Sequence, residues 1–131
     1  MDEKPLILIA DDEEYFRNIF SIKLKAEGFR VETAENGEEA VQKAGKLRPD
    51  LILMDVRMPK MDGINATLKL KEDQDTKDIK VVFLTSLGEP REGLEGTDVQ
   101  VAKDIGAADY VRKSDDLKIL VQKINALLGK T

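Results

Sequence analysis

The chain has 131 residues, and its 26 acidic and 21 basic side chains give a formal net charge of −5. It contains no His and no Cys, which excludes the usual zinc sites, His-assisted Ser or Cys nucleophiles, and disulfides. The length suits one domain, the acidic balance argues against a nucleic-acid-binding surface, and any chemistry must come from carboxylates, hydroxyls, Lys or Arg with a bound metal.

The first half of the chain alternates short apolar runs with segments of helical period. Residues 6–10 are continuously apolar, as in a strand covered on both faces. This run is too short for a signal peptide or a membrane span, so we expect a cytoplasmic protein. An apolar stripe then predicts a helix from Phe16 to a capping Gly28. Residues 29–32 alternate, which is typical of an edge strand, and a second helix follows and ends before Pro49.

The second half continues this alternation. Residues 51–54 and 81–84 are again continuously apolar and predict two buried strands, with a third helix between them. An extended loop is expected at about 87–97, followed by a fourth helix, an edge strand at 108–112, and a fifth helix after polar capping residues. The alternation predicts a single α/β domain over residues 1–131. Its parallel sheet would be doubly wound and five-stranded, with helices on both faces.

Polar side chains stand where the predicted strands end. Asp11 and Asp12 follow the first strand and Asp55 the third, while Thr85 follows the fourth and Lys113 the fifth. Because ligands bind at the carboxyl ends of the strands in such sheets, we expect these side chains to converge. Crowded carboxylates either raise the pKa of one member or require a cation, for which their oxygens favour Mg²⁺. A metal, a carboxylate nucleophile, a hydroxyl and an ammonium are the groups that phosphoryl transfer uses.

Taken together and in order, these motifs resemble the receiver domain of two-component response regulators, in particular chemotaxis regulators. The resemblance covers nearly the whole chain and rests on Asp11-Asp12, Met54-Asp55-Val56-Arg57-Met58-Pro59, Met61-Asp62-Gly63, Thr85-Ser86 and Tyr110-Val111-Arg112-Lys113. It implies a flavodoxin-like fold with the sheet order 2-1-3-4-5. It also implies a signalling phosphoacceptor of a phosphorelay, not a conventional enzyme.

The resemblance implies a role for each acid. Asp55 would be the phosphoacceptor, whose carboxylate attacks a phosphohistidine of a sensor histidine kinase or phosphotransfer protein. Asp12 would bind Mg²⁺ directly, and Asp11 would act mainly through water. Asp55 itself and the backbone carbonyl of Arg57 would complete the protein's share of the metal ligands.

The resemblance also implies a switch. Thr85 and Lys113 would bind the phosphoryl group after transfer, and Tyr110 would swing inward when Thr85 moves. Phosphorylation adds negative charge and acceptor oxygens, so these contacts exist in only one state. The binding surface of the fourth helix, fifth strand and fifth helix would change, and an unidentified downstream protein would bind there. Direct contact with nucleic acid or a membrane is not expected.

Three features depart from the usual pattern of the family. Ser114 follows Lys113 where Pro is usual, so we expect a trans peptide bond there. The chain before Lys113 is longer than is typical, with the excess in the loop at about 87–97. Arg57 and Leu87 are bulky and flank the path of an attacking water, so they would modulate hydrolysis of the acyl phosphate and make it slow.

Two other functions fit the same residues. One is a protein-interaction module on the receiver fold that works without phosphorylation, which Ser114 and the long loop favour. The other is a phosphatase acting on small acyl phosphates, which would release more than one phosphate per chain. The phosphoacceptor function uses all of the polar groups at the strand ends and is the expected one.

Overall fold

The computed structural model describes residues 4–86 and 103–129. The elements follow in the order β1 (Leu6–Ala10), α1 (Glu14–Ala26), β2 (Arg30–Ala34), α2 (Gly37–Leu47), β3 (Leu51–Asp55), α3 (Gly63–Glu72), β4 (Lys80–Thr85), β5 (Asp109–Arg112) and α5 (Leu117–Leu127). The expected loop at about 87–97 and most of the expected fourth helix lie outside the described residues. Within the described part, no helix combines the length and the apolar character needed to cross a membrane.

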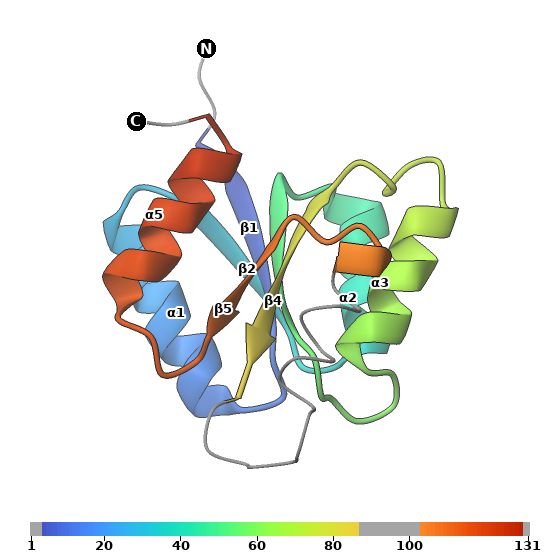
Figure 1. Cartoon of the computed structure of the whole chain (residues 1–131), viewed down its shortest axis with the longest axis horizontal. Coiled ribbons are helices and arrows are strands. Elements are labelled where there is room, and N and C mark those ends of the chain that lie inside the picture. The colour runs from blue at the N-terminus through green and yellow to red at the C-terminus, as the bar shows by residue number, and fades with distance from the viewer. Residues whose placement is uncertain (1–3, 87–102, 130–131) are drawn as a thin grey trace.

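The strands form one five-stranded parallel sheet in the order β2-β1-β3-β4-β5. Helices α1 and α5 cover one face of this sheet, and α2 and α3 cover the other (Figure 1). The predicted doubly wound sheet is therefore confirmed, including the two mixed-polarity strands, β2 and β5, at its edges. Since all strands are parallel, their carboxyl ends share one rim of the sheet.

Each face of the sheet has its own apolar core. Side chains along a strand point alternately to the two faces, so the continuously apolar runs supply both cores. The strand residues packed beneath α1 and α5 are Ile7, Ile9, Leu51, Leu53, Val82, Leu84 and Val111. Those packed beneath α2 and α3 are Leu8, Ala10, Ala34, Ile52, Met54, Val81 and Phe83. The two cores hold the carboxyl ends of the central strands in fixed positions.

Strands β3 and β4 each end on the polar residue that the sequence places after the apolar run. Asp55 is the last residue of β3, alongside Leu84, and Thr85 is the last residue of β4, alongside Arg112. The neighbouring strand continues far enough to pair with each backbone, although the side chains are polar. Both side chains therefore project from regular strand backbone and not from a loop.

Polar side chains cap the helices near this rim. Asp62 Oδ1 accepts a hydrogen bond from the backbone N–H of Asn65 at 2.7 Å and so begins α3. Asp116 Oδ1 accepts one from the N–H of Lys118 at 2.9 Å and begins α5, within the predicted capping run. These caps fix where the chain turns back after β3 and after β5.

Candidate functional site

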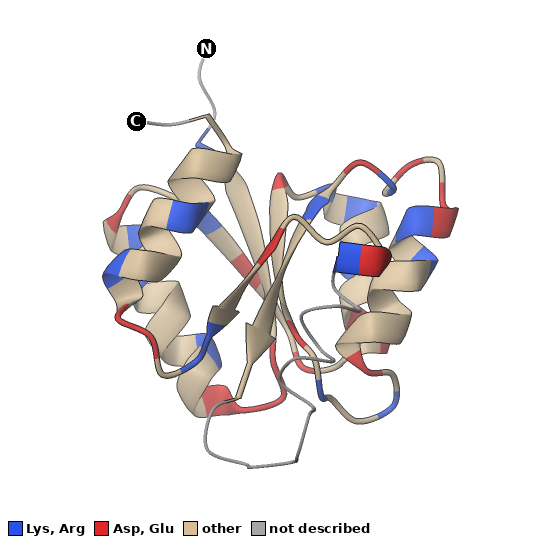
Figure 2. Cartoon of the chain, in the orientation of Figure 1, with Lys and Arg blue, Asp and Glu red and all other residues tan. Residues whose placement is uncertain are grey.

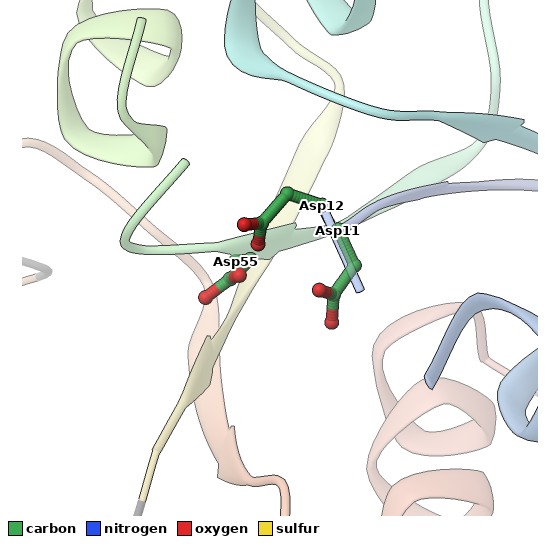
Figure 3. A group of neighbouring side chains, drawn as sticks. All are labelled: Asp11, Asp12 and Asp55. Atoms are coloured by element: carbon green, nitrogen blue, oxygen red, sulfur yellow. The ribbon is translucent and has the colours of Figure 1, made fainter. Parts of the chain in front are cut away.

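Three carboxylates meet where β1 and β3 end. Asp11 and Asp12 directly follow β1, and Asp55 ends β3 (Figure 3). One carboxylate oxygen from each residue lies within 4.8 Å of the other two. Asp11 and Asp55 are buried and Asp12 is exposed. Further acidic residues lie on the loops at this rim (Figure 2). The structure thus brings together the three acids that the sequence singled out.

Asp11 is fixed by the chain around it. Its backbone N–H donates to the carbonyl of Ala34 at 3.0 Å, and its Oδ1 accepts the N–H of Glu13 at 2.9 Å. Its Oδ2 lies 2.9 Å from Nζ of Lys113, but the two groups are not aligned as a hydrogen bond. Because buried carboxylate oxygens normally accept hydrogen bonds, this oxygen has capacity left for a donor or a cation.

Lys113 reaches the acids from the end of β5. Its Nζ lies 3.2 Å from Asp55 Oδ2, 3.2 Å from Glu13 Oε1, and 4.6 Å from the ring centroid of Phe16. The Lys113 side chain is only 4% exposed. Burial acts to lower the pKa of Lys113, but contacts with Asp11, Asp55 and Glu13 outweigh it and raise the pKa above its ordinary value. Lys113 is therefore a cation at neutral pH.

Asp55 has an unusual electrostatic environment. Burial raises the pKa of Asp55, Lys113 opposes this, and the Asp11 carboxylate adds to it, so that the pKa reaches about 7 instead of 3.8. The backbone N–H of Arg57 donates to Asp55 Oδ1 at 3.3 Å and also favours the charged form. The Asp55 carboxyl is therefore protonated more readily than that of an ordinary Asp, and an added cation would favour the carboxylate.

Thr85 ends β4, beside the end of β3, and Tyr110 lies on β5 opposite Phe83, two residues before that strand ends. Thr85 is buried, and its carbonyl accepts the N–H of Lys113 at 2.8 Å. Tyr110 is half-buried and packs against the core beneath α2 and α3. Nζ of Lys123 donates to the Tyr110 carbonyl at 2.7 Å and lies 4.9 Å from the centre of its ring. Thr85 is thus tied to Lys113 through the backbone, and Tyr110 is held to α5.

The remaining sequence expectations concern the loops. The peptide bond between Lys113 and Ser114 is trans, as expected for a bond that precedes a residue other than Pro. Arg57 is exposed, two residues beyond Asp55, so its side chain is free to lie over the rim. Leu87 lies outside the described residues.

Sequence reasoning missed two neighbours of Lys113, namely Glu13 and Phe16. Glu13 belongs to the acidic run after β1, and Phe16 belongs to the apolar stripe of α1. Neither pattern indicates a contact with a residue about a hundred positions further along the chain. The contact depends on the arrangement of the sheet, which puts the start of α1 and the end of β5 at one rim.

Two glycines permit close backbone packing behind Asp55. A Cβ on Gly63 would lie 2.1 Å from the carbonyl oxygen of Asp55, and a Cβ on Gly37 would lie 2.2 Å from that of Met61. The N–H of Gly63 donates to the carbonyl of Val56 at 2.9 Å, and the N–H of Gly37 donates to that of Met61 at 3.0 Å. The loop between β3 and α3 is therefore packed against both helix starts with no space for a side chain.

The donor set fits Mg²⁺. Carboxylate oxygens are hard donors, which are the ligands that Mg²⁺ prefers. One oxygen each from Asp11, Asp12 and Asp55 lies within 4.8 Å of the other two, so the three carboxylates are close enough to share one ion. The Asp11 oxygen without a hydrogen bond supports the same fit.

The chain is similar to proteins of one signalling family. The family model for the response regulator receiver domain matches residues 7–125. The chain is 36% identical over 127 residues to the DNA-binding dual master transcriptional regulator RpaA of a Synechocystis species, covering 97% of this chain and 50% of that protein. It is 35% identical over 125 residues to the phosphate regulon transcriptional regulatory protein PhoB of Pseudomonas aeruginosa, covering 95% and 52%. The chain thus spans about half the length of these curated relatives.

Solved structures show the same similarity in three dimensions. The chemotaxis protein CheY4 of Vibrio cholerae is 30% identical and superposes with a TM-score of 0.83, covering 95% of this chain and 99% of that one. A putative response regulator from Chloroflexus aurantiacus is 26% identical, with a TM-score of 0.87 and coverage of 98% and 100%. The similarity therefore extends over the whole sheet and its helices.

Proposed function

Because the chain belongs to the response regulator receiver domain family, we propose that it accepts a phosphoryl group on Asp55 and changes its binding surface in response. The observation that carries this proposal is the environment of Asp55. Its buried carboxylate ends a central strand, lies beside Asp11 and Asp12, and has the Lys113 ammonium 3.2 Å away. A buried carboxylate with two acidic neighbours and one cation is costly for stability alone, and it suits a reaction that adds an anion and a metal.

The Asp55 carboxylate acts as the nucleophile. One of its oxygens attacks the phosphorus of a phosphohistidine, an acyl O–P bond forms, and the P–N bond breaks; the ring nitrogen keeps the bonding electrons, and the ring leaves as neutral imidazole because it takes up one proton from solvent or from the donor protein. Lys113 favours the ionised Asp55 and offsets part of the charge that the incoming group brings. These 131 residues contain no His, so the donor histidine lies outside them, and we assign it to a sensor histidine kinase or a phosphotransfer protein.

Mg²⁺ is the cofactor that we assign to the acidic cluster. Asp12, Asp55 and the backbone carbonyl of Arg57 would hold it directly, and Asp11 would act mainly through water. When bound, Mg²⁺ neutralises charge on the transferring phosphoryl group. The hard oxygen donors and their spacing at the rim support this assignment.

Thr85, Lys113 and Tyr110 are the residues that we assign to the switch. After transfer, the Thr85 hydroxyl and the Lys113 ammonium would each contact phosphoryl oxygens that the free carboxylate does not offer. A backbone hydrogen bond of 2.8 Å already joins Thr85 and Lys113, so a shift of one backbone would move the other. Tyr110 would swing inward as Thr85 moves. The surface formed by the expected fourth helix, β5 and α5 would then change shape, and a downstream protein would bind it differently.

The output controlled by this switch lies outside the residues of the site. The two curated relatives are named transcriptional regulators, and one of them is named as DNA-binding. Because the chain spans about half of their length, we assign any such output to another domain or another protein. The receiver itself would bind proteins and not nucleic acid.

Intact-mass measurement after incubation with acetyl phosphate and Mg²⁺ tests the proposal. The wild-type protein should gain the mass of one phosphoryl group, and Asp55→Asn should gain none. Asp78→Asn, which changes an exposed Asp far from the rim, should behave as the wild type. No gain in the wild type, or a gain that persists in Asp55→Asn, would overturn the proposal.

The released phosphate and an NMR spectrum separate the alternatives. A phosphatase would release several phosphates per chain while acetyl phosphate is consumed. An interaction module that works without phosphorylation would gain no mass, and its NMR spectrum would not change on addition of beryllofluoride, a phosphoryl mimic.

A further inference from the structure

Glu13 makes a contact that the function of a phosphoacceptor does not require. It is the N-cap residue of α1, yet its side chain does not cap the helix. Instead, its Oε1 accepts a hydrogen bond from Nζ of Lys113 at 3.2 Å. The Glu13 side chain is 54% exposed, so this carboxylate extends from the rim toward a buried ammonium. Its position is therefore determined by Lys113 and not by the helix that it begins.

The Lys113 ammonium already has as many carboxylate neighbours as it has N–H groups. Asp11 Oδ2 lies 2.9 Å from its Nζ, and Asp55 Oδ2 and Glu13 Oε1 each lie 3.2 Å away. Two N–H groups of Lys113 donate hydrogen bonds to Asp55 and Glu13, and the ion pair with Asp11 adds a third attraction on the ammonium. A phosphoryl group that approaches Lys113 therefore competes with these carboxylates for the ammonium.

Glu13 is the partner that is released at the lowest cost. The side chains of Asp11 and Asp55 are 0% and 5% exposed, and they would lose a cationic neighbour without gaining water. Glu13 is half exposed and would be solvated again as it leaves. It also lies outside the group of acids that can share a metal ion. Its release therefore leaves the acidic cluster intact.

From these contacts, and on the basis of the proposed function, we infer that Glu13 is a positioning residue that competes with the phosphoryl group for Lys113. In the unphosphorylated domain, Glu13 holds the ammonium toward α1. When the phosphoryl group arrives, Glu13 gives up this contact and turns to solvent. Its negative charge also repels the phosphoryl group and attracts Mg²⁺, so Glu13 affects the two ligands in opposite directions.

The test compares Glu13→Gln with Glu14→Gln in two NMR titrations. Mg²⁺ is added to the metal-free protein in the first, and beryllofluoride is added to the Mg²⁺-saturated protein in the second. Glu14 is an exposed acid next to Glu13 on the first turn of α1, so its variant removes the same charge from nearly the same place. Glu13→Gln should bind beryllofluoride about twofold to fivefold more tightly, the range expected for loss of a half-exposed ion pair, and Mg²⁺ less tightly. Glu14→Gln should change both affinities less.

A third variant, Glu13→Asp, separates the contact from the charge. This variant keeps the charge, but its side chain is one methylene shorter and can cap α1, so it should lose the contact with Lys113. Beryllofluoride should therefore bind more tightly, as it does to Glu13→Gln. If the wild type binds no beryllofluoride, the proposed function fails. If the wild type binds it but Glu13→Gln binds no more tightly than Glu14→Gln, the competition is refuted and the phosphoacceptor function stands. If Glu13→Gln binds both Mg²⁺ and beryllofluoride more weakly, the role of Glu13 is only structural, and the competition for Lys113 is also refuted.

Discussion

Asp55→Asn is expected to stabilise the metal-free protein. Burial is the main reason that the pKa of Asp55 is about 7, compared with 3.8 for an ordinary Asp, so a charged Asp55 is unfavourable in the folded state. Asn has nearly the same shape and no charge, and it still offers an acceptor to the N–H of Arg57. At 1.36 kcal/mol per pKa unit, the shift corresponds to about 4 kcal/mol of free energy of unfolding when Asp55 is fully ionised.

The expected gain depends on pH in one direction. Between pH 3.8 and about 7, the folded state keeps a proton on Asp55 that the unfolded state has released, so the stability of the wild type falls as the pH rises through this window. The loss of stability caused by ionised Asp55 is absent below pH 3.8 and complete above about pH 7. The advantage of Asp55→Asn should therefore be about 4 kcal/mol at pH 8 and less than about 2 kcal/mol at pH 5.

Urea unfolding in the presence of a chelator, at pH 8 and at pH 5, measures both values. Asp78→Asn is the matched control, because Asp78 is exposed and its substitution should change the stability by less than about 0.5 kcal/mol. Saturating Mg²⁺ should raise the free energy of unfolding of the wild type at pH 8 and so reduce its difference from that of Asp55→Asn. No gain at pH 8, or an equal gain at both pH values, would refute the electrostatic reasoning.

Two further predictions concern residues beside Asp55. In the same urea assay, Gly63→Ala should lower the free energy of unfolding by about 3 kcal/mol or more, because the added Cβ would lie 2.1 Å from a backbone oxygen. Gly45→Ala in α2 is the control, because a Cβ there meets nothing within 4 Å. It should raise the free energy of unfolding by about 0.5–1 kcal/mol. Equal effects of the two substitutions would contradict the packing described for Gly63. Arg57→Ala should shorten the lifetime of the acyl phosphate on Asp55, followed by the loss of the phosphorylated mass with time, and an unchanged lifetime would show that Arg57 does not shield the phosphoryl group.

The sequence predicted most of the architecture because the strands are short, apolar and bounded by polar residues. The convergence of Asp11, Asp12 and Asp55 followed from parallel strands ending at one rim, which needs no knowledge of individual contacts. The sheet order, by contrast, came from the family resemblance, and the approach of Glu13 to Lys113 depends on that order. Periodicity within a segment carries no information about which strand lies beside another.

The raised pKa of Asp55 was expected for a partly different reason. The sequence indicated repulsion between crowded carboxylates, but burial is the largest cause in the structure. Burial depends on how far the strand pairing continues, and β3 includes Asp55 as its last paired residue. The apolar run before Asp55 indicates where the strand ends, but it does not show how deeply the last residue of the strand is buried.

The two glycines behind the site restrict how this sequence can diverge. Gly37 and Gly63 lie against carbonyl oxygens of Met61 and Asp55, where even a methyl group has no space. A surface acid can be exchanged while the fold is kept, but a side chain at either glycine would require a new path for the loop between β3 and α3. A homologue that keeps all three acids but carries a larger residue at one of these positions should therefore differ in the length or course of that loop. The two glycines therefore constrain the geometry of the site together with the three carboxylates.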